Sequence, residues 1–249
     1  MLVGHSSKSV HVFRKRSLTV AAPIGATSVS ECFFRKTSPY FRMRALSHGW
    51  QLIAGPVVSE SLIPGFIRPA VRSVPPRMAQ HLGLCRVSIV EELENPEVAS
   101  QWTCTDRELL VSLAASGRDE HDVALELLLC VGQALWEKLS PAQRKAYWLL
   151  VDQEINAGIA GEIDEDALEQ KKVLLSGRSS AASRRRLERY GSASFAGTVA
   201  EYIHSLWHDV TIRSGPDFLP APQLRRRLEL LSRWYPPARG RRLFPRAQD

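Results

Sequence analysis

Two histidines in the last quarter of this chain have a spacing that suits metal binding. His204 and His208 are four residues apart in a segment that we expect to be helical, and Glu201 stands three residues before them. Side chains at this spacing share one helix face, where two imidazoles and a carboxylate can bind zinc, nickel or copper. Such pairs are also common on solvated faces, and we favour that interpretation from sequence alone. His121 is expected to be a surface residue at the start of an earlier helix.

A second pattern has the frame of a zinc-binding helix without its ligands. In the sequence HExxH, two histidines on one helix face bind zinc, and the glutamate after the first acts as general base. In the segment LELLLCVGQ, residues 125–133, Glu126 falls at the base position, and Gly132 at the glycine that often follows. The histidine positions hold Leu125 and Leu129, and leucine has no lone pair to donate to a cation.

A third pattern lies further along the chain, in the segment SASFAGTVAEY, residues 192–202. It is similar to the helix that supplies the third zinc ligand in several bacterial zincin-type (HExxH) metallopeptidases, which reads approximately S-x-x-E-D-F-A-E-x-F-A-x-Y. Gly197 takes the place of the ligand glutamate. The matching residues are Phe195, Ala196, Ala200 and Tyr202.

Over about residues 62–237 the chain therefore resembles a degenerate zincin-type metallopeptidase. The resemblance implies an α+β fold with a small front β-sheet followed by a helical half. It also implies former metal-ligand positions at Leu125, Leu129 and Gly197, so we expect no catalytic residue and no cofactor. Glu126 is then a vestigial base, most simply a surface carboxylate. The expected function is non-catalytic, either binding a peptide or protein or regulating a partner.

Two alternatives stay open. One is an active metal-dependent hydrolase, a peptidase in which Glu201, His204 and His208 hold zinc, with a contribution from Glu126 or His121. The weaker one is binding of nucleic acid or another anionic surface through the basic N-terminal arm and the arginine runs at 184–186 and 225–227. Solvated helix faces are the default interpretation of both runs.

The positive charge of the chain is concentrated at its beginning. Residues 1–59 carry eight Lys and Arg and one acid, whereas the remaining residues carry 25 of each, so the net charge of +7 belongs to the first part. We expect residues 1–58 to be a disordered arm, or a segment upstream of the true start with Met43 as an internal start. Residues 59–249 form the expected zincin-like domain.

The elements that must position these residues are two or three strands followed by helices. Strands are expected over 85–93 and within 98–113, after a proline-rich stretch at 62–76 that disfavours a long helix. A short helical turn is expected at 77–83. Later helices are expected at about 119–139, at 141–158 after a capping box at Ser140, at 164–176, at 195–209 after a cap at Ser194, and from Pro222.

Several other chemistries are excluded. The four cysteines have no CxxC spacing, and P-loop, GxGxxG and GxSxG sequences are absent. No apolar run reaches the roughly 18–20 residues that span a bilayer. We expect free, mostly buried thiols, tryptophans that anchor the core, and a soluble cytoplasmic protein.

Overall fold

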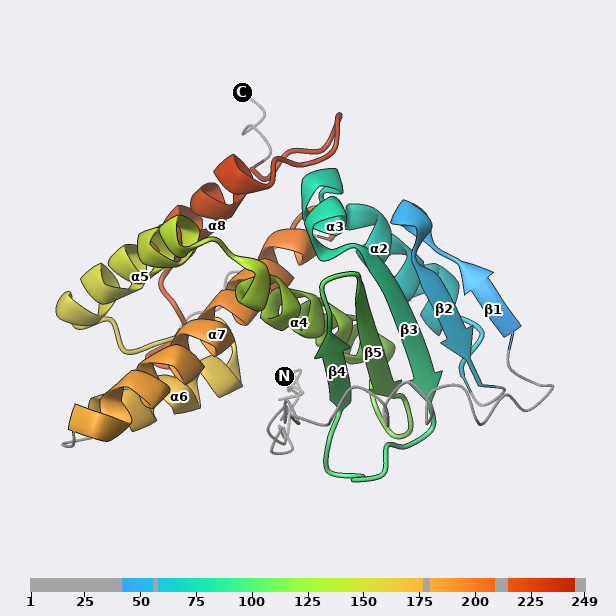
Figure 1. Ribbon diagram of the computed structural model, residues 1–249, viewed down its shortest axis with the longest axis horizontal. Coiled ribbons are helices and arrows are strands. Elements are labelled where there is room, and N and C mark those ends of the chain that lie inside the picture. Colours follow the sequence, from blue (N-terminus) through green and yellow to red (C-terminus); the bar gives the residue numbers. More distant parts are fainter. Residues whose placement is uncertain (1–41, 56–57, 177–179, 209–214, 245–249) are drawn as a thin grey trace, which may run out of the picture.

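The first half of the chain forms a mixed β-sheet and the second half is helical (Figure 1). The computed structural model describes residues 42–55, 58–176, 180–208 and 215–244. The sheet has five strands in the order β1-β2-β3-β5-β4, and β2, β3 and β5 run parallel to one another. The outer strands run antiparallel to their neighbours. The strands are β1 (Arg42–Ala45), β2 (Gln51–Ala54), β3 (Leu84–Val90), β4 (Ser100–Cys104) and β5 (Glu108–Ala114).

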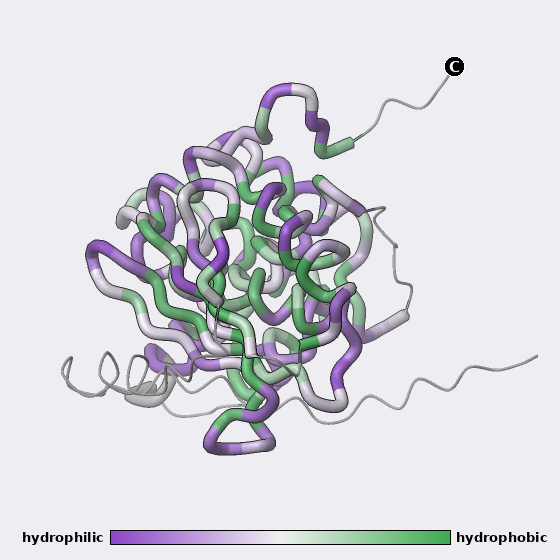
Figure 2. Tube along the Cα trace, turned by 90° about the vertical axis from the view of Figure 1, so that its right-hand side faces the viewer, coloured by the Kyte–Doolittle hydropathy of each residue, from purple (hydrophilic) through white to green (hydrophobic). Residues whose placement is uncertain are grey.

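The sheet packs its helices against one face. Figure 1 shows α2, α3 and α4 behind the strands, and Figure 2 shows hydrophobic residues concentrated toward the centre of the molecule. Along β3, Cys85, Val87 and Ile89 are fully buried, whereas the residues between them are half-buried. Burial of each such aliphatic side chain stabilises the fold by roughly 1.5–3 kcal/mol. The α+β class and the strand expected near 85–93 are confirmed.

The first two strands correct the expected domain boundary. Residues 42–54, assigned from composition to a disordered arm, form β1 and β2, and β2 pairs in parallel with β3. Trp50 and Leu52 from this segment are 1% and 0% exposed. The boundary at residue 58 is therefore wrong, because local composition does not reveal pairing with a strand thirty residues later. Residues 1–41 lie outside the described part of the chain.

The helices follow the expected order with two corrections. A π-helical segment, η2 (Leu62–Ile67), continues directly into α2 (Arg68–Ser73), although prolines had disfavoured a long helix there. Pro69 is the second residue of α2 and directly follows the π-helical segment. The helix α7 spans Ser180–His204, so Ser194 lies inside it and is not a cap. The other helices are α3 (Pro76–Leu82), α4 (Glu120–Lys138), α5 (Pro141–Asn156), α6 (Glu165–Ser176) and α8 (Ala221–Trp234), with a short 3-10 turn, η1 (Ser47–Gly49), between the first two strands.

Local capping explains where α4 and α5 begin. The Asp119 carboxylate accepts a hydrogen bond from the His121 backbone N–H, and Ser140 and Gln143 form the reciprocal capping box that the sequence predicts. Trp136 is 2% exposed and packs in the core, as expected of the tryptophans. Among the described residues no helix is long and apolar enough to cross a membrane.

Candidate functional site

The two helices that carry the metallopeptidase resemblance pack directly against each other. A Cβ added at Gly132 of α4 would lie 2.6 Å from the Ala196 Cα of α7, so only glycine permits this approach. The helices run antiparallel, because His121 near the start of α4 meets His204 at the end of α7, while Trp136 contacts Glu188. The contact joins the two segments that carry the resemblance, residues 125–133 of α4 and residues 192–202 of α7.

Two of the three positions predicted to be former ligands, Leu125 and Leu129, lie in the middle of this helix pair. Leu125 is two helical turns before Gly132 and therefore on the side of α4 that faces α7, with Leu129 beside it. Both leucines are half-buried. Gly197 is buried in α7, but its missing side chain would point toward the segment before α6, 3.1 Å from the Asp164 Cβ. That segment limits the space into which a side chain at position 197 could grow.

The zinc ion implied by the resemblance does not fit this centre. Leu125 and Leu129 offer no lone pair, Gly197 offers no side chain, and the neighbourhood of the helix contact is apolar. Glu126 corrects the expectation of a surface carboxylate, because it is only 7% exposed and its Oε2 accepts a hydrogen bond of 3.1 Å from Ser100 Oγ on β4. Glu126 therefore helps to fix α4 on the edge strand.

A cluster of three histidines lies at the end of the same helix pair. His121 Nε2 lies 2.9 Å from His204 Nε2, and the two rings are T-shaped at a centroid separation of 4.9 Å. The His208 ring stacks on His204 at 5.2 Å and lies 5.7 Å from His121. His204 is 9% exposed, His121 is half-buried and His208 is exposed. The metal-site alternative predicted from the sequence gave the His204–His208 pair a contribution from Glu126 or His121, and the structure brings His121 to the pair while Glu126 bonds to Ser100.

Carboxylates stand beside this histidine cluster. Ligand atoms of Asp119, His121 and Asp122 all lie within 4.8 Å of one another, the only such group of three among the described residues. Glu201, predicted as a third ligand with His204 and His208, is half-buried one turn earlier on α7 and does not belong to that group. His121 therefore adjoins both the imidazoles of α7 and the acidic start of α4.

A second polar cluster is fully buried and was not predicted. Arg227, assigned from sequence to a solvated arginine run, is 0% exposed. Its guanidinium donates to Glu154 on α5 at 3.0 Å and to Glu162, before α6, at 2.8 Å. Lys171 of α6 donates to the other oxygen of Glu162 at 3.0 Å. We call these four charged residues the ionic network.

Hydroxyl groups complete the ionic network. Tyr190 donates to Glu162 at 2.5 Å, and Ser194 accepts from Arg227 at 2.8 Å while it bonds to Tyr147 at 2.9 Å. Burial alone would raise the pKa of Glu162, but Arg227, Lys171 and the Tyr190 hydroxyl outweigh it and lower this pKa to about 2. The network is closed to solvent and fully paired, so its role is to join four helices. A ligand has no access to it.

The open edge of the sheet offers a different kind of site. In the β4–β5 pair, the Ala114 N–H donates to the Ala99 carbonyl and the Thr105 N–H donates to the Glu108 carbonyl, both at 2.9 Å. Backbone groups alternate in direction along an antiparallel strand. Those of Ser100, Trp102 and Cys104 consequently point away from β5, and no described strand pairs with them.

Trp102 adds an unsatisfied donor at this edge. Its indole N–H is buried and has no hydrogen-bond partner within the described ranges. Buried polar groups are nearly always paired, so such an atom calls for an explanation.

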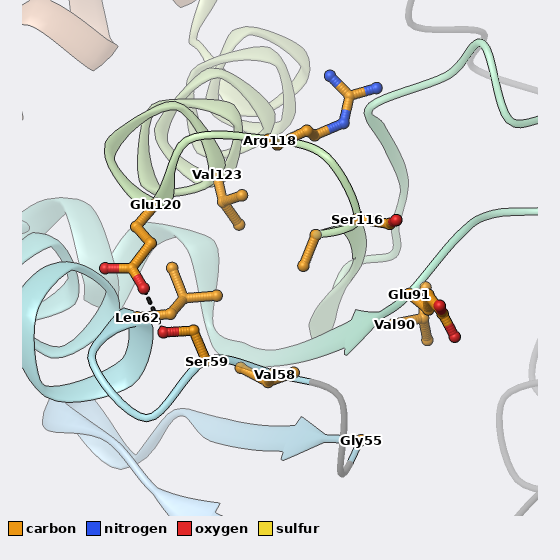
Figure 3. Close-up of a pocket in the computed structure, with 11 residues that line it drawn as sticks. Gly55, Val58, Ser59, Leu62, Val90, Glu91, Ser116, Arg118, Glu120 and Val123 are labelled. Atoms are coloured by element: carbon orange, nitrogen blue, oxygen red, sulfur yellow. Dashed lines mark hydrogen bonds between the residues drawn. The ribbon is translucent and has the colours of Figure 1, made fainter.

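A small pocket lies where the three parallel strands end (Figure 3). It has a volume of about 330 Å³ and is lined by residues that follow β2, β3 and β5 and by the start of α4. Ligands of parallel sheets commonly bind at this edge. In Figure 3, however, Ser59 donates to Glu120 across the pocket wall, so the polar groups on that side already bond to each other. The pocket was not predicted, because its lining comes from three separate stretches of the chain.

The described cysteines do not provide a reactive thiol. Cys85, Cys104 and Cys130 are free thiols, and Cys85 and Cys130 are buried, as expected. Burial raises the pKa of Cys130 to about 12 and that of Cys85 well above its ordinary range. Neither is a thiolate near neutral pH, so neither is an activated nucleophile there. Cys32 lies outside the described residues.

Comparisons of the chain with protein-family models, with curated proteins and with solved structures find no match.

Proposed function

We propose that this chain is a non-catalytic, metallopeptidase-like domain that binds an extended peptide segment along the open edge of β4. The order of its elements supports the metallopeptidase resemblance: a sheet, the motif helix α4, intervening helices, and α7 returning to α4. The apolar residues at the former ligand positions support the absence of catalysis. The zincin-like fold remains part of this proposal.

The observation that carries the proposal is the backbone of β4. Ser100, Trp102 and Cys104 direct N–H and C=O groups away from the sheet, and an added strand can bond to such groups. The sequence of β4, SQWTC, contains no charge and no proline, whereas exposed edges are usually protected by one or the other. At the opposite edge, β1 carries the exposed Arg44. Of the two edges of the described sheet, only β4 has the composition of one that accepts a partner.

Side chains at this edge can add selectivity to main-chain pairing. Trp102 and Cys104 are half-buried and lie two residues apart on the same face, where a side chain of the peptide can pack against them. Ser100 on that face is held by Glu126 of α4, so the edge is rigid where the peptide would begin or end. A fixed edge reduces the entropy lost on binding.

The alternatives weighed from the sequence have less support. An active hydrolase on Glu201, His204 and His208 requires a base near a bound water, and Glu126 is buried beside Ser100. Binding of an anionic surface relied on the arm, most of which lies outside the described residues, and on an arginine run in which Arg227 is buried. Both remain predictions.

A proline substitution tests the pairing of the edge. Peptides that bind the full chain would be selected from a random linear library, and their affinities measured by fluorescence anisotropy for Trp102→Pro and Trp102→Ala. Both variants lose the indole, but only proline removes the outward N–H, and it leaves the bonds to β5 intact. We expect binding to Trp102→Pro to be about tenfold weaker than to Trp102→Ala, the value of one main-chain hydrogen bond.

The matched pair also separates pairing from unfolding. Circular dichroism and melting of the two variants should agree closely, because the lost N–H has no partner within the described sheet. Mass spectrometry should find the selected peptides intact after incubation with the wild-type chain. Equal affinities for the two variants, or cleavage of the peptides, would contradict the proposal.

A further inference from the structure

Three imidazoles lie next to one another at the junction of the α4 N-terminus and the α7 C-terminus: His121 of α4, His204 of α7, and His208 in the turn that follows α7. We infer that His121, His204 and His208 form a binding site for one divalent transition-metal ion of the zinc, nickel and copper class. This site is separate from the centre at Leu125, Leu129 and Gly197 and does not depend on the proposed peptide binding. Neutral imidazole is the preferred ligand of these borderline metals.

The distance between the first two ligand atoms suits shared coordination. His121 Nε2 and His204 Nε2 are 2.9 Å apart. A tetrahedral ion with nitrogen ligands at about 2.0–2.1 Å holds them about 3.3 Å apart. A small outward shift of two side chains would therefore admit the ion. The fold brings these atoms together from positions 83 residues apart in the sequence.

His208 completes the set from one helical turn beyond His204. Its ring is nearly parallel to that of His204, with an interplanar angle of 12°. The three imidazoles do not form a group with all ligand atoms within 4.8 Å of one another. Since His208 is exposed, rotation about its side-chain torsions can turn a ring nitrogen toward the other two. Two preplaced ligands and one adjustable ligand would form the site.

The surroundings favour a cation and leave a donor beside it. Asp119 and Asp122 stand next to His121 and attract a cation, whereas the negative end of the α7 dipole and the positive end of the α4 dipole oppose each other here. Trp207 packs against His204 and His208 at ring separations of 5.5 and 5.4 Å. Its buried indole N–H has no hydrogen-bond partner within the described part of the chain and could donate to a water on the metal.

Titration of the full chain with zinc, nickel and copper chlorides tests the inference. Isothermal calorimetry should give one ion per chain, and bound copper should quench part of the tryptophan fluorescence because Trp207 adjoins two of the ligands. Calcium and magnesium, which prefer oxygen ligands, should bind far more weakly. Absence of stoichiometric binding by all three transition metals would overturn the inference.

Substitutions assign the ligands. His204→Ala and His208→Ala should each weaken zinc binding by about tenfold or more. If the variant of the buried His204 fails to fold, His208→Ala still tests the site, because His208 is exposed and its loss does not disturb the core. A matched control is His48→Asn, which removes an imidazole whose ring contact is with Trp50, outside the cluster, and asparagine tolerates the positive φ of 64° at that position. This control should bind zinc as the wild type does.

Asp122→Asn distinguishes the neighbouring carboxylate group. If metal binding is lost in Asp122→Asn and kept in His208→Ala, the ion belongs to Asp119, His121 and Asp122, and the three-histidine site is wrong. Loss in His208→Ala with retention in Asp122→Asn supports it.

Discussion

The ionic network and the histidine cluster both gather polar side chains from several helices, but they differ in access to solvent. All four charges of the ionic network, Arg227, Glu154, Glu162 and Lys171, are at most 2% exposed and bonded to one another. In the histidine cluster, solvent exposure increases from His204, which is buried, through His121 to His208, which is exposed. Buried charges that satisfy each other stabilise only as a complete set. Polar groups with a path to solvent can instead exchange a partner for a ligand.

Breaking the ionic network should have the largest effect on stability. Arg227→Met leaves the buried Glu154 without its cation. Glu162 then keeps Lys171 as its ion-pair partner and the Tyr190 hydroxyl as a hydrogen-bond donor. Removal of one partner from a buried ion pair costs about 3–5 kcal/mol, so we expect a loss of this size in the free energy of unfolding. Urea titration followed by circular dichroism measures it.

The same helix α8 supplies the control for this prediction. Arg225 forms an exposed pair with Glu229 at 2.9 Å, and exposed pairs of this kind contribute about 0.3–0.5 kcal/mol. Arg225→Met should therefore change the free energy of unfolding by less than about 0.5 kcal/mol, and His208→Ala without metal should do the same. Similar losses for Arg227→Met and Arg225→Met would show that the network is not closed.

The second largest effect on the free energy of unfolding should come from acid, which protonates Glu162 in the ionic network. The pKa of Glu162 falls from its ordinary value of 4.5 to about 2 in the folded chain. A carboxyl with a lowered pKa stabilises the fold fully above its unfolded value, and this stabilisation is lost as the pH falls from about 4.5 toward 2. The lowering corresponds to about 3 kcal/mol. Unfolding titrations between pH 2 and 7 should show the loss.

The Arg227→Met variant sharpens the acid test. Since Arg227 lowers the pKa of Glu162, its removal should raise this pKa and flatten the dependence of stability on pH between about 4.5 and 2. An unchanged slope in Arg227→Met would mean that Glu162 does not titrate against this arginine.

Elements with local signals could be predicted from the sequence. The capping box at Ser140 predicts the start of α5, and the acidic cap at Asp119 predicts α4, because each signal acts within one helical turn. The alternating apolar residues of β3 are equally local. The strands β1 and β2 were missed because a short segment becomes a strand only through its neighbour, here β3. Composition alone placed them in a disordered arm.

The candidate sites show the same limit. The His204–His208 pair could be predicted because its spacing is local, whereas its contact with His121 depends on the antiparallel packing of α4 and α7. Arg227 was assigned to solvent because its run, Arg225–Arg227, looks uniformly charged. Arg227 points inward because Glu154 and Glu162 lie inside the fold and accept its hydrogen bonds, which the local sequence does not reveal.

Zinc affinity of a back-substituted chain tests most directly whether the centre of the α4–α7 pair is a former metal site. The triple variant Leu125→His, Leu129→His, Gly197→Glu would be compared with the double variant that keeps Gly197. Both would carry His208→Ala, which removes the proposed histidine site. The two histidines should bind zinc from one face of α4 and raise the melting temperature relative to chelator.

The Gly197→Glu substitution is the decisive addition, because the new carboxylate must reach past Asp164 to join the two imidazoles. If the three positions once formed one site, the triple variant should bind zinc at least about tenfold more tightly than the double variant. Equal zinc affinities in two folded variants would show that position 197 never faced the metal, and would contradict the metallopeptidase-like interpretation of this chain.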